Sequence, residues 1–131
     1  MENSSKRILV VEDEEGLREM LKLIFSEEGY EVDTAVNGKQ AWDLLNFNQY
    51  DLLATDLYMP VMNGIDLIIQ TQAAFPEMNI IMLSGGGKEV EVNHGNKVVK
   101  YLEQEVTVDM FLKKPFDLNE LLDIVEKLVA A

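Results

Sequence analysis

The chain has 131 residues, of which 47% are hydrophobic and 27% are charged, so it is long enough for one well-packed domain and too apolar to be disordered. Its 24 acidic residues outnumber the 11 basic ones and give a formal net charge of −13, which disfavours binding to the phosphate backbone of DNA or RNA. Cysteine is absent, which excludes disulfides, thiol catalysis and cysteine-based metal sites.

The first part of the chain alternates short apolar runs with helical patterns. Residues 8–11 are an unbroken apolar run, typical of a strand buried on both faces of a parallel sheet. Apolar residues then recur at helical spacing over 17–25, and Gly29 is a suitable stop for that helix. A weaker strand is expected over 31–35, and a short second helix around 41–45.

The same alternation continues to the end of the chain. A third strand is predicted over 52–55, and a third helix begins near Ile65 and must end before Pro76. The fourth strand is expected over 79–83, and the fifth over 110–112. A last helix follows, with an apolar stripe formed by Leu118, Leu121, Leu122, Val125 and Val129.

The segment between the fourth and fifth strands is harder to interpret. Three glycines, Gly85 to Gly87, break the pattern and are expected to loosen the loop. Residues 88–96 are polar and ambiguous, and we expect a fourth helix from Val98 to Glu105. Taken together, the alternation predicts a doubly wound (βα)5 fold, with a parallel sheet covered by helices on both faces.

Membrane insertion and export are not expected. The first seven residues lack the apolar core of a signal peptide, and no apolar run approaches the roughly 20 residues of a membrane span. We therefore expect a cytoplasmic protein with a single domain over residues 1–131, a core over about 6–129 and no output domain.

Polar side chains follow four of the predicted strands, at the edge where an open α/β sheet binds its ligands. They are Glu12 and Asp13 after the first strand, Asp56 after the third, Ser84 after the fourth, and Lys113 and Lys114 after the fifth. Carboxylates that share a pocket repel each other, and a hard cation such as Mg²⁺ would relieve this. A remaining carboxylate can act as a nucleophile toward phosphorus, while a lysine neutralises the transferring group.

Five motifs in order carry a resemblance to a known family over essentially the whole chain. They are Val10-Val11-Glu12-Asp13, Thr55-Asp56-Leu57-Tyr58-Met59-Pro60, Asn63-Gly64, Leu83-Ser84-Gly85, and Phe111-Leu112-Lys113-Lys114-Pro115-Phe116. With this spacing, the chain resembles the receiver domain of bacterial two-component response regulators. The resemblance implies a flavodoxin-like sheet of order 2-1-3-4-5; a chemotaxis regulator of this family is itself a standard example of that order.

The resemblance also implies a role for each site residue. Asp56 would be the phosphoacceptor, and Lys114 and Ser84 would contact the phosphoryl group, with Lys113 outside the site. Mg²⁺, with Mn²⁺ as an alternative, would be held by Glu12, Asp13, Asp56 and the backbone carbonyl of Tyr58. Phe111 would take the switching-aromatic position, and Ser84 would move with it.

As a stand-alone receiver, the chain would signal rather than catalyse turnover. It would accept its phosphoryl group from a sensor histidine kinase or a histidine phosphotransfer protein, lose it slowly, and act on a separate protein, without nucleic-acid binding. The sequence departs from the family pattern in Glu12, where Asp is frequent, and in the length of the segment from Ser84 to Lys114.

Two alternatives come from other classes of protein. A phosphatase resembling the haloacid dehalogenases would turn over through an aspartyl-phosphate. Such enzymes carry Asp-x-Asp after the first strand, whereas Asp56 follows the third strand here and Tyr58 stands where the second Asp would be. A flavodoxin-like binding module is the other alternative, and a colourless purified protein would disfavour it.

Overall fold

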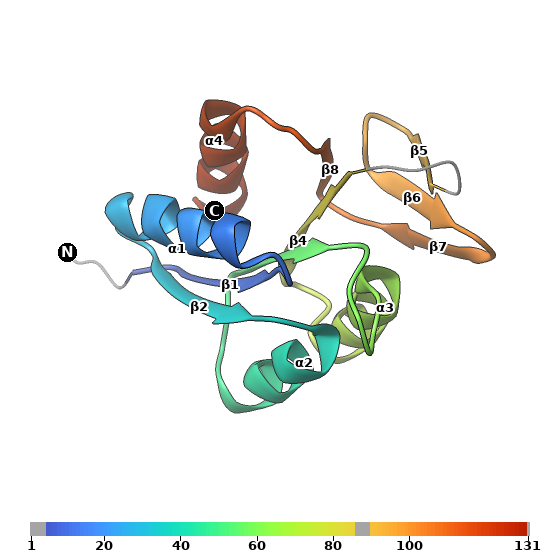
Figure 1. Ribbon diagram of the computed structural model, residues 1–131, viewed down its shortest axis with the longest axis horizontal. Helices are drawn as coiled ribbons and strands as arrows, with labels where there is room; N and C mark the ends of the chain where they lie inside the picture. The colour runs from blue at the N-terminus through green and yellow to red at the C-terminus, as the bar shows by residue number, and fades with distance from the viewer. Residues whose placement is uncertain (1–4, 86–89, 131) are drawn as a thin grey trace.

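A computed structural model describes residues 5–85 and 90–130 of the chain. Its centre is a five-stranded parallel sheet of order β2-β1-β3-β4-β8 (Figure 1). The strands are β1 (Arg7–Val11), β2 (Glu31–Ala35), β3 (Leu52–Asp56), β4 (Asn79–Ser84) and β8 (Met110–Lys113). Because β8 occupies the place of the fifth parallel strand, the predicted order 2-1-3-4-5 and the fold class are confirmed.

Two helices cover each face of the sheet. One face packs against α1 (Glu15–Glu27) and α4 (Leu118–Val129), and the other against α2 (Gly38–Phe47) and α3 (Gly64–Ala74) (Figure 1). Successive side chains of a strand point to opposite faces, so Ile8 and Val10 join the first layer while Leu9 and Val11 join the second. This two-sided burial explains the unbroken apolar runs of the inner strands.

The helix ends follow from local sequence signals. Gly29 has a φ of 98° and follows α1, where the N–H of Tyr30 donates to Phe25 O and that of Gly29 to Ser26 O, the bonding pattern of a Schellman cap. The side chain of Asn63 caps α3 by accepting from the N–H of Asp66 at 2.9 Å. This cap fixes where the helix beyond the β3–α3 loop begins.

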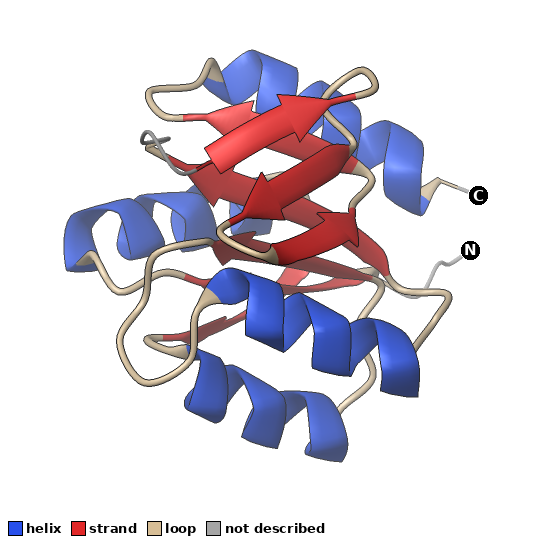
Figure 2. Cartoon of the chain, turned by 90° about the vertical axis from the view of Figure 1, so that its right-hand side faces the viewer, coloured by secondary structure: helices blue, strands red, loops and turns tan. Residues whose placement is uncertain are grey.

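The fourth crossover is made by strands. The helix predicted from Val98 to Glu105 is wrong, because this part of the chain forms a three-stranded antiparallel sheet of order β5-β6-β7 (Figure 2). Its strands are β5 (Val90–Asn93), β6 (Val98–Tyr101) and β7 (Gln104–Thr107). We call these three strands the small sheet. Leu102 lies inside the predicted helix, has a φ of 57° and stands in the turn between β6 and β7, a conformation that a right-handed helix cannot accommodate.

The small sheet lies in the same layer as α2 and α3 (Figures 1 and 2). On its inner side, Val99 and Val106 are buried in one apolar cluster with Phe111 of β8. It is also joined to the region of β8 by hydrogen bonds from the N–H of Phe111 to Asn96 O and from that of Val108 to Lys97 O, each 2.7 Å long. The predicted loosening by Gly85 to Gly87 falls largely outside the described residues, since only Gly85 is among them.

The helices that the structure describes do not include one that is both long and apolar enough to cross a lipid bilayer. All four belong to the two layers that cover the central sheet.

Candidate functional site

Three carboxylates meet at the carboxyl ends of β1 and β3. Glu12 and Asp13 directly follow β1, and Asp56 is the last residue of β3. One carboxylate oxygen from each residue lies within 4.8 Å of the others. Glu12 and Asp56 are buried, at 1% and 5% exposure, whereas Asp13 is exposed at the rim. The structure therefore brings together the three acidic residues predicted from the sequence.

Lys114 reaches into this cluster from the end of β8. Its Nζ donates to Glu12 Oε1 at 2.8 Å and to Asp56 Oδ2 at 3.2 Å. The backbone N–H of Lys114 donates to Ser84 O at 2.7 Å, which fixes the lysine to the end of the neighbouring strand. Lys113 is exposed, and its side chain makes none of these contacts. Of the two adjacent lysines, only Lys114 is placed to neutralise charge in the cluster.

Burial dominates the electrostatics of the cluster. It raises the pKa of both Glu12 and Asp56, because a carboxylate that loses water is harder to ionise, and the hydrogen bonds and charge of Lys114 only partly counter this. For Lys114, burial lowers the pKa, but the hydrogen bond to Glu12 and the charge of Asp56 outweigh it and raise the pKa overall. Lys114 therefore stays a cation, and the two buried carboxylates compete for it.

The loop after β3, residues 57–63, forms one wall of the site. The N–H of Tyr58 faces Asp56 Oδ1 at 3.4 Å, and the N–H of Gly64 donates to Leu57 O at 2.8 Å, closing the loop. A Cβ added at Gly64 would collide with the backbone oxygen of Asp56. Glycine in the Asn63-Gly64 motif is thus needed for the start of α3 to approach the site closely.

The two residues predicted to switch lie on neighbouring strands. Ser84 ends β4 and is fully buried. Phe111 lies one strand further along, in register with Met82, and is 5% exposed. Its ring belongs to the apolar cluster that includes the small sheet. Phe111 is therefore packed inside the molecule in this conformation.

The donor set suits a small hard cation. The oxygens of Glu12, Asp13 and Asp56 lie close enough to share one ion, and Mg²⁺ prefers oxygen ligands while keeping several waters. The exposed position of Asp13 leaves the site open to solvent on one side. The residues present therefore fit Mg²⁺, with the Tyr58 carbonyl as a further candidate ligand on the adjacent loop.

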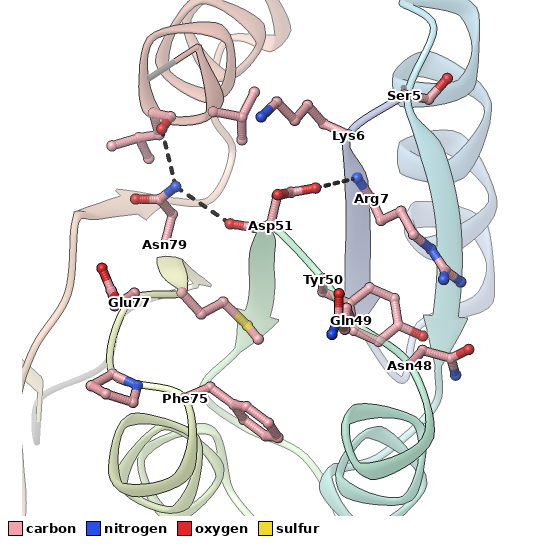
Figure 3. A pocket seen from close by; sticks show the side chains of 14 residues that line it. Ser5, Lys6, Arg7, Asn48, Gln49, Tyr50, Asp51, Phe75, Glu77 and Asn79 are labelled. Carbon is pink, nitrogen blue, oxygen red and sulfur yellow. Dashed lines mark hydrogen bonds between the residues drawn. The ribbon is translucent and has the colours of Figure 1, made fainter. Parts of the chain in front are cut away.

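A separate pocket of about 790 Å³ lies at the opposite end of the sheet, where the strands begin (Figure 3). There the Asp51 side chain accepts from the N–H of Arg7 at 2.8 Å, and Asn79 Nδ2 donates to Asp51 O and Leu128 O at 3.3 and 3.0 Å. These bonds tie the starts of β1, β3 and β4 to the end of α4. The polar groups of this pocket thus hold the fold together at a distance from the carboxylate cluster.

Two residues near the site were missed by sequence reasoning. The ring of Tyr101 meets that of Tyr58 edge to face, with centroids 5.5 Å apart and an interplanar angle of 86°. Gln104 Nε2 donates to Asp66 Oδ1 at 2.7 Å. Both belong to the segment predicted as a helix. The β-branched pairs Val98-Val99 and Val106-Thr107 were the signal that favours strands there.

Comparisons with known proteins agree with this geometry. The family model described as "Response regulator receiver domain" matches residues 8–126. The chain is 30% identical over 123 residues to sporulation initiation phosphotransferase F of Bacillus subtilis, covering 94% of this chain and 93% of that protein. It is 34% identical over 124 residues to the DNA-binding transcriptional regulator NtrC of Azospirillum brasilense, where it covers 95% of this chain but only 24% of the relative.

Solved structures give the same result. The response regulator TrrA of Thermotoga maritima, crystallised in complex with Mg²⁺-BeF, has a TM-score of 0.77 and 32% identity, over 94% of this chain and 98% of that one. A Francisella response regulator receiver domain has a TM-score of 0.79 and 27% identity, over 96% and 98%. The five motifs, the strand order and the carboxylate cluster coincide with a family match over nearly the whole chain, which therefore belongs to the response regulator receiver domain family.

Proposed function

We propose that this chain accepts a phosphoryl group on Asp56 from a phosphohistidine of a sensor kinase or phosphotransfer protein and passes the signal to a separate protein. The observation that carries this proposal is the set of groups that surround the Asp56 side chain. It is buried beside Glu12 and Asp13, with one oxygen bonded to Lys114 and the other facing the N–H of Tyr58. A relative of nearly the same length is named a phosphotransferase.

The chemistry follows from these contacts. An oxygen of Asp56 attacks phosphorus, an O–P bond forms as the N–P bond of the donor breaks, and the imidazole nitrogen keeps the electron pair. Lys114 and the N–H of Tyr58 lie where they can neutralise the equatorial oxygens, and Ser84 is a further donor. Mg²⁺, when held by Glu12, Asp13, Asp56 and the Tyr58 carbonyl, supplies charge compensation. The neighbour TrrA was crystallised with Mg²⁺-BeF.

Mass spectrometry of the intact protein tests the acceptor. After incubation with phosphoramidate and Mg²⁺, we expect one added phosphoryl group in the wild type and none in Asp56→Asn. Phosphorylation of the Asp56→Asn protein would refute the assignment. Steady turnover of a generic phosphate ester would instead favour a phosphatase.

Isothermal titration should show Mg²⁺ binding to the wild type and its loss in Asp13→Ala, which removes one of the three carboxylates.

A further inference from the structure

The small sheet contacts the β3–α3 loop near its start and α3 just beyond the end of the loop. Near its start, the Tyr58 ring meets the Tyr101 ring at the end of β6. Just beyond its end, Asp66 of α3 accepts from Gln104, the first residue of β7. Because Tyr101 and Gln104 are a register pair of the β6–β7 hairpin, both contacts come from the same hairpin. The loop therefore has one common support.

The loop depends on support from outside itself. It has no regular secondary structure between β3 and α3, and Val61 within it has a φ of 73°, which is unfavourable for a β-branched residue. Its internal bonds close only a few residues, through Met62 N to Pro60 O and Gly64 N to Leu57 O. Tyr58, the residue next to the cluster, is 37% exposed. The aromatic contact with Tyr101 is therefore able to bias the position of Tyr58.

The β6–β7 hairpin is itself held in place by contacts with the rest of the fold. Gln72 Nε2 of α3 donates to Thr107 O of β7 at 2.6 Å, so that β7 runs beside α3 (Figure 1). Val99 and Val106, a register pair of the hairpin itself, are buried on its inner side. Asp66 makes two hydrogen bonds here. Its side chain accepts from Gln104, and its backbone N–H donates to the capping side chain of Asn63. The hairpin therefore fixes both the first turn of α3 and the start of the loop relative to one another.

We infer that Tyr101 and Gln104 are positioning residues, which hold residues 57–63 in the conformation that presents the Tyr58 N–H to Asp56 and the Tyr58 carbonyl to a bound cation. This inference rests on the proposed function, because it assigns the hairpin to the proposed Mg²⁺ and phosphoryl site. When a binding-competent loop is less populated, the apparent affinity falls by the same fraction. An edge-to-face pair of this kind corresponds to about a twofold to tenfold change in that population.

The test compares four variants of the full chain: Tyr101→Ala, Tyr101→Phe, Gln104→Ala and Lys100→Ala. Lys100 is the matched control, since it is exposed and neighbours Tyr101 on the same strand. Amide hydrogen exchange without metal should be faster in residues 57–63 of Tyr101→Ala and Gln104→Ala, and unchanged in Lys100→Ala. Titration calorimetry should show Mg²⁺ binding weakened about twofold to tenfold in the same two variants. Tyr101→Phe keeps the ring and should match the wild type.

A double-variant cycle separates positioning from general destabilisation. If Tyr101 acts through Tyr58, Tyr101→Ala should weaken Mg²⁺ binding in the wild type but add nothing in a Tyr58→Ala background. If the losses of Mg²⁺ affinity in Tyr101→Ala and Tyr58→Ala were additive, the inference would be overturned. It would also be overturned if Tyr101→Ala and Gln104→Ala both had the same hydrogen-exchange rates and Mg²⁺ affinity as the wild type. Should Tyr101→Ala fail to fold, Gln104→Ala decides by the same readouts. A wild type that binds Mg²⁺ but takes no phosphoryl group from phosphoramidate would overturn the proposed function, while the exchange data would still decide the role of the hairpin.

Discussion

At the scale of single residues, the site combines two buried carboxylates with one lysine. Glu12 and Asp56 both hydrogen-bond Lys114 Nζ, and burial raises the pKa of each carboxyl group. One cation cannot fully compensate two desolvated anions. The protein without metal therefore carries unfavourable charge in the place where a divalent cation and a phosphoryl group are proposed to bind.

This charge predicts how stability depends on pH. Because the pKa values of Glu12 and Asp56 are raised on folding, the folded state holds these protons more tightly than the unfolded state. Their contribution to stability is fully present below about pH 4 and is lost as the pH rises through the folded pKa values. Without metal and at constant ionic strength, we expect the free energy of unfolding, measured by urea denaturation, to fall from mildly acidic to neutral pH.

The control is the Glu12→Gln/Asp56→Asn double variant, in which this part of the pH dependence should disappear. Mg²⁺ should stabilise the wild type at neutral pH, and less so in acid, because protons compete for its ligands. A metal-free wild type whose stability increases from mildly acidic to neutral pH would contradict the electrostatic account.

At the scale of elements, Gly64 shows how a backbone contact shapes the site. Alanine at this position would place a Cβ against the backbone of Asp56 and Leu57, and this contact could be relieved only by moving Asp56 or the start of α3. We expect Gly64→Ala to lower the free energy of unfolding by about 1 to 3 kcal/mol and to weaken Mg²⁺ binding. Thermal or urea denaturation measures the first effect, and calorimetry the second.

Gly16 is the matched comparison. It lies in the first turn of α1, where an added Cβ would meet no atom within 4 Å. Gly16→Ala should therefore stabilise the protein, by about 0.5 to 1 kcal/mol, through the entropy of the unfolded chain. Equal effects of the two substitutions would mean that the close approach at Gly64 is not what requires glycine there.

The elements also show how far the sequence could be interpreted. Strands β1, β3 and β4 were predictable because burial on both faces leaves unbroken apolar runs, and Gly29 marked the end of α1. The polar residues that end these strands predicted the cluster. Residues 98–105 were mistaken for a helix because the four-residue strands β6 and β7 are too short for the periodicity of a strand to be told from that of a helix. The contacts of Tyr101 and Gln104 depend on that tertiary packing, and no local motif marks them.

At the scale of the whole molecule, the charge of −13 constrains its partners. The relative NtrC is named a DNA-binding regulator, but this chain spans only about a quarter of it. Such a surface repels a phosphate backbone at long range. In gel-shift experiments at physiological salt, we expect this chain to leave double-stranded DNA unshifted, with and without phosphorylation. A saturable complex that survives added salt would show that local contacts override the net charge.

The outer face of the small sheet has its own geometry. Glu91, Lys100 and Glu105 are exposed and adjacent across β5, β6 and β7, so that opposite charges alternate across strands about 4.8 Å apart. A helix instead presents ridges of side chains that recur with a pitch of about 5.4 Å along a narrow cylinder. A partner whose surface is complementary to a helix between the fourth and last parallel strands would instead meet a sheet face with alternating charges here. We therefore expect a partner protein that recognises a helix at this place in the fold to bind this chain weakly, because the difference lies in the backbone of the small sheet and not in a few side chains.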